Sequence, residues 1–273
     1  MPPPTRADEP PKFRAGVLNI DKAAGATSFA VVRHLRRLTG AHRVGHAGTL
    51  DPLATGVLPI LFESATRLAE FALQLQKTYV ADIHFGFTTA TDDAEGDRIP
   101  AGEASALSGH DVEAALSAFT GRFLQEPPAF SAVKVDGKRA YKLARQGEAP
   151  RPSAREVEVY AARLIEFTSG SEPVARVEIT CGSGTYLRSI ARDLGRRLGV
   201  GGYLGGLVRT AYGPQRVKLT PEQEAMVRQG RSVRVLPEPE PGRLRAHDSG
   251  GRLVALGHTD PLRRTFVPEK VLS

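Results

Sequence analysis

"GHAGTLDPLATGVLPI", residues 45–60, contains a single acidic side chain, Asp51, in a run that is otherwise mostly small or apolar. Gly48 and Gly56 lie on either side of it, and His46 lies five residues upstream. Glycine allows the backbone to take a positive φ and to approach a ligand closely. An aspartate before a proline is typical of a turn, whereas a lone carboxylate held in an apolar pocket is typical of a catalytic group. This stretch alone leaves both interpretations open.

The composition is typical of a globular chain. Its 273 residues are 41% hydrophobic and 25% charged, which suits one large domain or one domain with a small appendage. No apolar run approaches the roughly 18 residues that cross a bilayer, and the Pro-rich residues 1–14 are expected to form a disordered tail rather than a signal. The single cysteine, Cys181, excludes an internal disulfide and a Cys-based zinc cluster. We therefore expect a cytoplasmic protein with no membrane association.

Positive charge is in excess, because 37 Lys and Arg residues against 30 Asp and Glu residues give a net charge of +7. The charge is concentrated in three blocks, residues 33–43, 138–155 and 188–197. Separated basic blocks favour a polyanionic partner and a broad track along a phosphate backbone. Each block could equally be the solvated face of a helix.

Strand and helix patterns are mixed without a regular βαβ rhythm. Residues 155–167 and 174–181 alternate between apolar and polar side chains, which predicts antiparallel strands. Thr27 or Ser28 is expected to cap a helix that runs to about Leu38, with its apolar face at Phe29, Val32, Leu35 and Leu38. The pattern predicts an α+β fold.

The domain organisation follows from a Pro-rich segment near the C-terminus. Residues 236–243, LPEPEPGR, are typical of a linker. We expect a main domain over residues 15–235 and a small C-terminal β segment over residues 244–273.

The run that contains Asp51 closely resembles the catalytic motif of tRNA pseudouridine synthases of the TruB family, which act on uridine-55 of the tRNA TΨC loop. Other blocks resemble the same family in order along the chain: NIDKAAGATS (19–28), KTYVADIHFG (77–86), TDDAEG (91–96), PPAFSAVKVDGKRAYKLARQGE (127–148), CGSGTYLRSIARDLG (181–195) and GGLVRTAYGP (205–214). The last residues resemble a shortened PUA module. Ala23 and Val208 depart from the family's usual proline and arginine.

The resemblance implies the pseudouridine synthase fold, a mixed and largely antiparallel sheet with flanking helices and a central RNA-binding cleft. It makes residues 15–235 the catalytic domain. It also implies a tRNA substrate, base flipping, no cofactor, no metal and no obligate protein partner, and we expect a monomer.

The resemblance also assigns the chemistry. Pseudouridylation breaks the N1–C1′ bond, turns the uracil and joins C5 to C1′. A carboxylate can serve as nucleophile or as base at the ribose, and Asp51 is the expected catalyst. Burial disfavours the ionised form, so a nearby cation is needed. The family pattern puts Arg188 in that role.

Other positions match the family's substrate contacts. His46 is expected to fill the place that the flipped base leaves, and Tyr79 to stack on that base. Asp93 is expected to orient the substrate or a neighbouring side chain, and Leu207 to form an apolar wall of the uracil pocket. As isolated residues, each has an ordinary structural alternative in a turn or a core.

Supporting positions are assigned in the same way. Lys22 and Gly48 are expected to support the loop that carries Asp51. Lys142, Arg145 and Arg192 are expected to contact the RNA backbone.

Two alternatives remain open at this point. The same chemistry could act on a uridine of another RNA, or the protein could be a tRNA-folding chaperone in which catalysis is secondary. A glycosidase with paired carboxylates is disfavoured, because the motif offers no second acid.

Overall fold

The computed structural model describes residues 15–135, 137–148, 150, 152–213, 215–235, 243–260 and 262–271. The expected tail, residues 1–14, and nearly all of the expected linker lie outside these residues. The chain divides into two compact units. The first runs to Gln74 and includes Val208–Tyr212, and the second comprises Leu75–Leu207 and Gly213–Ser273.

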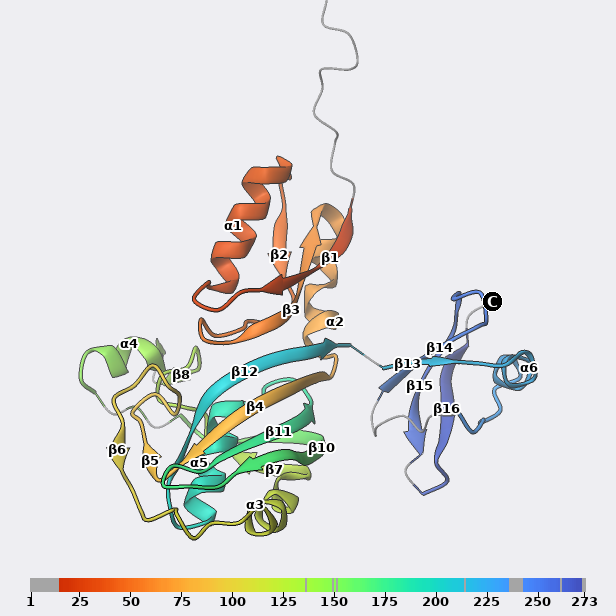
Figure 1. Cartoon of the computed structure of the whole chain (residues 1–273). Helices are drawn as coiled ribbons and strands as arrows, with labels where there is room; N and C mark the ends of the chain where they lie inside the picture. Colours follow the sequence, from red (N-terminus) through yellow and green to blue (C-terminus); the bar gives the residue numbers. More distant parts are fainter. Residues whose placement is uncertain are drawn as a thin grey trace, which may run out of the picture. The chain divides into compact units, whose positions relative to one another are not determined.

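The first unit is built around β3. Its elements are β1 (Gly16–Lys22), α1 (Ser28–Thr39), β2 (Val44–His46), β3 (Thr55–Phe62), the 3₁₀ helix η1 (Glu63–Leu68), α2 (Ala69–Leu73) and the end of β12 (Gly202–Tyr212). Both β1 and β2 pair antiparallel with β3, whereas β12 pairs parallel with it. Helix α1 lies beside β2 (Figure 1). The loop between β2 and β3, residues 47–54, is the one that carries Asp51.

The ends of α1 agree with the sequence, but its apolar face does not. The Thr27 side chain accepts a hydrogen bond from the amide of Ala30, and Gly40 ends the helix with a φ of 65°. Val32 and Leu35 are buried, as expected. Phe29 and Leu38 are 69% and 72% exposed, so their assignment to the buried face was wrong. At 100° per residue they fall outside the narrow stripe that this helix buries.

The second unit contains the other half of the main sheet. Its strands are β4 (Lys77–Phe85), β7 (Gly121–Gln125), β10 (Arg155–Thr168), β11 (Val174–Cys181) and the first part of β12, in the order β12-β4-β11-β10-β7. The pairs β4–β11, β11–β10 and β10–β7 are antiparallel. In β4 every second residue is buried, as in a strand with one face on a core. The mixed, largely antiparallel arrangement confirms the α+β prediction.

Helices and short hairpins surround these strands. They are β5 (Phe87–Thr88) with β6 (Ile99–Pro100), α3 (Gly109–Leu116), the 3₁₀ helix η2 (Ser117–Phe119), β8 (Lys134–Val135) with β9 (Lys138–Arg139), α4 (Ala140–Arg145) and α5 (Leu187–Arg197). Helix α5 packs against β4 (Figure 1) through an apolar face that includes Ile190 and Leu194. The opposite face of α5 carries Arg188 and Arg192.

The C-terminal module has a sheet and a core of its own. It contains β13 (Gln215–Lys218), α6 (Pro221–Arg228), β14 (Arg243–His247), β15 (Leu253–Asp260) and β16 (Thr265–Val271), with the strands in that order. Val217, Val227 and Val233 pack in one cluster with Leu244 and Phe266. The sheet therefore begins at β13, upstream of the boundary that the sequence analysis placed at residues 236–243, because these valines complete its core.

No helix among the described residues is long and apolar enough to cross a membrane.

Candidate active site

The loop that carries Asp51 is a tight turn between two strands. Ala54 donates its amide to the carbonyl of Asp51 at 3.1 Å, with Pro52 at the second position of the turn. Gly48 and Gly56 have φ values of 90° and 96°, which only glycine takes without strain. Asp51 itself is half-buried. Asp51 is therefore both the first residue of a turn and a half-buried carboxylate, so the two interpretations of this stretch do not exclude each other.

Lys22, the last residue of β1, is hydrogen-bonded to this loop. Its side chain is 1% exposed, and its ammonium donates to the carbonyls of Ala23, Ala26 and Pro52 at 3.0, 2.7 and 3.3 Å. Burial lowers the pKa of Lys22, the Asp51 carboxylate opposes this, and Arg209 adds to it. Lys22 thus supports the loop, as the resemblance implied. The group that it binds at residue 23 is the backbone carbonyl, which alanine and proline both have.

Ser28 is also hydrogen-bonded to the loop that carries Asp51. The Ser28 hydroxyl donates to the carbonyl of Leu50 at 3.1 Å and accepts from its amide at 2.9 Å. Ser28 is the first residue of α1. The start of this helix is therefore fixed to the residue that precedes Asp51.

Arg209 is a buried arginine beside the Asp51 loop that was not among the residues predicted from the sequence. It is 1% exposed, and its guanidinium donates to the carbonyls of Val57 and Gly48 at 2.7 and 3.2 Å. A Cβ on Gly56 would lie 2.3 Å from the carbonyl oxygen of Arg209, so only glycine fits there. The available signal was the arginine beside Val208 in the GGLVRTAYGP block. Val208 is itself 41% exposed.

His46 lies at the end of β2, where Arg209 also acts on it. Burial lowers the pKa of His46, and the Arg209 charge lowers it further. The ring is therefore neutral near pH 7. Among the described residues its buried Nδ1 has no hydrogen-bond partner. A neutral, half-buried ring is suited to contact with a base rather than with a phosphate.

In the second unit, Tyr79 and Leu207 lie on neighbouring strands. Tyr79 is buried on β4, opposite Ile179 of β11. Leu207 is half-buried on β12. Their expected contacts with the base stay predictions.

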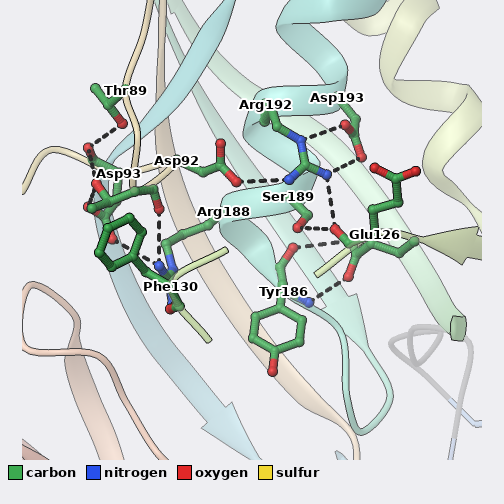
Figure 2. Close-up of polar contacts among 12 residues, drawn as sticks. Thr89, Asp92, Asp93, Glu126, Phe130, Tyr186, Arg188, Ser189, Arg192 and Asp193 are labelled. Atoms are coloured by element: carbon green, nitrogen blue, oxygen red, sulfur yellow. Dashed lines mark hydrogen bonds and ion pairs between the residues drawn. The ribbon is translucent and has the colours of Figure 1, made fainter. Parts of the chain in front are cut away.

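Arg188 and Asp93 form an ion pair in the second unit. Their charged atoms lie 3.4 Å apart, and the side chains are 8% and 3% exposed. Arg188 also donates to the carbonyls of Thr91 and Phe130 at 3.0 and 3.1 Å. Asp93 accepts from Thr91 and the amide of Glu95, and Figure 2 shows Asp93 beside Arg188. Asp93 therefore orients Arg188, which is one of the roles that the resemblance gave it.

Arg192 lies one turn further along α5 and is held by protein groups. It lies 2.8 Å from Asp92 and 2.9 Å from Asp193, and it donates to the carbonyl of Glu126 at 2.9 Å (Figure 2). Asp92 has a φ of 60°, a strained conformation for a residue with a side chain. This geometry favours a positioning role for Arg192 over the expected contact with RNA.

Part of the second basic block, residues 138–155, lines a concave surface in the second unit. A cavity of about 560 Å³ is lined by Lys134, Gly137, Lys138, Arg139, Lys142 and Gln146, with no acidic residue among them. Lys142 is exposed on α4. The side chain of Arg145 lies outside the described part of the structure.

The structure thus brings the predicted residues together in two groups. Lys22, His46 and Gly48 surround the Asp51 loop in the first unit, and Arg188 joins Asp93 in the second. The pairing of Asp51 with Arg188 stays a prediction. No cluster of His, Cys, Asp and Glu in the described ranges has the form of a metal site.

Comparison with known proteins gives one consistent family. The model described as "TruB family pseudouridylate synthase (N terminal domain)" matches residues 36–187. A protein of Synechococcus elongatus named tRNA pseudouridine synthase B is 53% identical over 197 residues, which cover 72% of this chain and 67% of the relative. A protein of the same name from Dehalococcoides mccartyi is 44% identical over 228 residues, covering 82% of this chain and 75% of the relative.

Solved structures agree on the fold. A crystal structure of a Cbf5-Nop10-Gar1 complex contains a chain with a TM-score of 0.55 and 23% identity, covering 94% of this chain and 84% of that one. A structure of an H/ACA RNP bound to a substrate RNA gives a TM-score of 0.53 at 21% identity, covering 94% and 85%. With the motif around Asp51 and the family match over most of the catalytic domain, the chain belongs to the TruB family of pseudouridylate synthases.

Proposed function

We propose that this enzyme converts uridine-55 in the TΨC loop of tRNA to pseudouridine, acting in the cytoplasm as a monomer. The relatives named tRNA pseudouridine synthase B support tRNA as the substrate. The observation that carries the proposal is the Asp51 turn, held by two buried cations, Lys22 and Arg209. Such a loop keeps a single carboxylate in a fixed place near positive charge.

In the proposed reaction, Asp51 acts at the ribose as nucleophile or base while the N1–C1′ bond breaks. The uracil then turns, C5 joins C1′ and loses its proton, and N1 ends protonated. Because the isomerisation is redox-neutral, it needs no electron donor or acceptor, and the proposal includes no cofactor and no metal. Arg188, oriented by Asp93, is the cation proposed to keep the carboxylate charged during the reaction.

The uridine must leave its stack before it can react, at a cost of a few kcal/mol. We propose that the neutral ring of His46 fills the vacated place. Tyr79 would stack on the flipped base, which contributes about 1–3 kcal/mol, with Leu207 as an apolar wall. The basic surface around Lys142, together with Arg145, would hold the RNA backbone.

The decisive experiment replaces Asp51 by asparagine. Asp51→Asn should lower turnover on unmodified tRNA by at least about a thousandfold, since it removes the reacting carboxylate. Binding of tRNA should change only a few-fold, because phosphate contacts dominate affinity. The exposed Asp21 on β1 offers a matched control, and Asp21→Asn should leave turnover unchanged.

Chemical mapping of pseudouridine in the product separates the alternatives. Modification confined to position 55, and lost in a tRNA with cytidine there, supports the proposal. Pseudouridine at another position would identify a different target. Substantial turnover in Asp51→Asn would remove this residue from the mechanism, and tRNA binding without any modification by the wild type would favour the folding-chaperone alternative.

A further inference from the structure

Helix α1 presents an exposed aromatic ring among exposed arginines. Phe29 is 69% exposed, and Arg33, Arg36 and Arg37 are exposed as well. At about 100° per residue these four side chains fall within an arc of about 100° on the helix. They therefore share one face, away from the buried Val32 and Leu35.

The same face borders a basic groove. A cavity of about 550 Å³ is lined by Arg33, Arg36, Arg37, Gly40, Ala41 and His42, with no acidic residue among them. Within the described part of the chain, none of the three guanidinium groups has an ion pair or a hydrogen bond. This distinguishes them from Arg188, Arg192 and Arg196 of α5, which pair with carboxylates.

Helix stability does not explain this face. Arg36 and Arg37 lie in the last turn, where the helix dipole favours cations. Arg33 lies one turn earlier, three and four residues from Arg36 and Arg37, where like charges destabilise a helix. An exposed phenylalanine adds no packing. The arrangement instead matches the combination that binds unpaired RNA, a cationic track with an aromatic ring on which a base can stack.

The position of the face in the first unit indicates which part of an RNA it could hold. Phe29 follows Ser28, whose hydroxyl is bonded to Leu50, the residue before Asp51. The helix rises 1.5 Å per residue, so the arginines extend about 12 Å from Phe29 along α1. The face therefore begins beside the catalytic loop and leads away from it.

We propose that this face of α1 is a second RNA-binding site, in which Phe29 stacks on an unpaired base and the three arginines bind the adjoining phosphates. The occupant is the substrate strand that continues from the reacting uridine. The proposal rests on the proposed function in that the enzyme acts on a nucleotide within an RNA loop. The α1 site goes beyond the proposed function because it contains none of the catalytic residues.

The test for stacking uses three substitutions of Phe29. Phe29→Ala and Phe29→Leu should weaken binding of unmodified tRNA by about 5- to 150-fold, the equivalent of about 1–3 kcal/mol for one stacked base. Phe29→Tyr should bind like the wild type, because it keeps the ring. If Phe29→Leu also binds like the wild type, the residue acts only through its apolar surface and the stacking role is overturned.

The test for phosphate binding uses a triple variant, Arg33→Gln, Arg36→Gln and Arg37→Gln. The slope of log K against log salt, measured between about 50 and 200 mM, should fall by about 2–3 units, one for each lost phosphate contact. The matched control replaces the exposed Arg122, Arg163 and Arg176 by glutamine; their partners are carboxylates, and the slope should not change. Thermal unfolding of both triple variants confirms that they fold.

The outcomes separate this inference from the proposed function. If the wild type forms pseudouridine but the α1 variants keep the wild-type affinity and salt slope, the α1 site is overturned while the function stands. If the wild type forms no pseudouridine at all, the function fails. Weaker RNA binding by the α1 variants in that case would still establish the site.

Discussion

The two units fix their functional loops in different ways. In the first, the buried cations Lys22 and Arg209 donate to backbone carbonyls of the loop and of its flanking strand. In the second, Arg188 and Arg192 donate to backbone carbonyls as well but also pair with the carboxylates of Asp93 and Asp92. The described contacts of the first arrangement join side chains to backbone, whereas those of the second also join side chain to side chain.

The two sets of cations look equivalent in the sequence, but in the structure they have different partners. A cation on carbonyls both holds a loop and acts on neighbouring titratable groups. Arg209 lowers the pKa of His46, after burial, and both Arg209 and Asp51 influence the pKa of Lys22. In the second unit burial raises the pKa of Asp92, and Arg192 and Arg188 oppose this. Three substitutions test this comparison.

The largest expected effect is at Arg188. Arg188→Met leaves the nearly fully buried Asp93 without its cation, which should lower the free energy of unfolding by about 3–5 kcal/mol. Adding Asp93→Asn should restore most of this loss, since asparagine can still accept from Thr91 and the amide of Glu95 without a charge. Urea unfolding measures both. Absence of rescue would show that the contacts of Arg188 to carbonyls dominate, and the contrast between the units would fail.

Lys22 should behave differently. Lys22→Met leaves three carbonyl oxygens without their donor and should lower the free energy of unfolding by about 1–3 kcal/mol. Most of this loss should remain when Asp51→Asn is added, because the lost partners are backbone groups. Lys134→Met, at an exposed lysine, serves as the control and should stay within about 0.5 kcal/mol. Complete rescue by Asp51→Asn would mean that Lys22 acts as an ion pair instead.

The smallest effect is the pH dependence at His46. Burial and Arg209 lower its pKa below the ordinary 6.5, so the unfolded chain binds the proton more readily. The stability contribution of neutral His46 is therefore complete above pH 6.5 and is lost as the pH falls through the folded pKa. Unfolding of the wild type and of His46→Asn, compared on both sides of pH 6.5, should diverge only on the acid side. Burial also lowers the pKa of His84. Because both proteins contain His84, its contribution to the difference in unfolding free energy cancels.

Local sequence signals predicted the Asp51 loop well, because turns and capping depend on neighbouring residues. Asp-Pro is typical of a turn, and a turn closes from Asp51 to Ala54; Thr27 or Ser28 was expected to start α1, and Thr27 caps it. Here the structure agrees because each feature needs only a few adjacent residues.

Contacts between residues far apart in the sequence could not be predicted from local patterns. Arg192 belongs to a basic block, and only the fold brings Asp92 against it from 100 residues away. Arg209 reaches Val57 across 152 residues. Phe29 has the spacing of a core residue, yet the buried stripe of α1 is too narrow to include it. Periodicity shows which residues share a face but does not show what covers that face.

The division of β12 between the units has a consequence for the order of events during synthesis. Residues 208–212 of this strand belong to the first unit, whose other described residues end at Gln74. A ribosome adds more than a hundred residues between these two segments, so the nascent first unit lacks both its last strand and Arg209 for most of that time. Non-local closure of this kind is slow. The enzyme should consequently acquire its competent Asp51 turn late, after most of the second unit has already emerged and can fold.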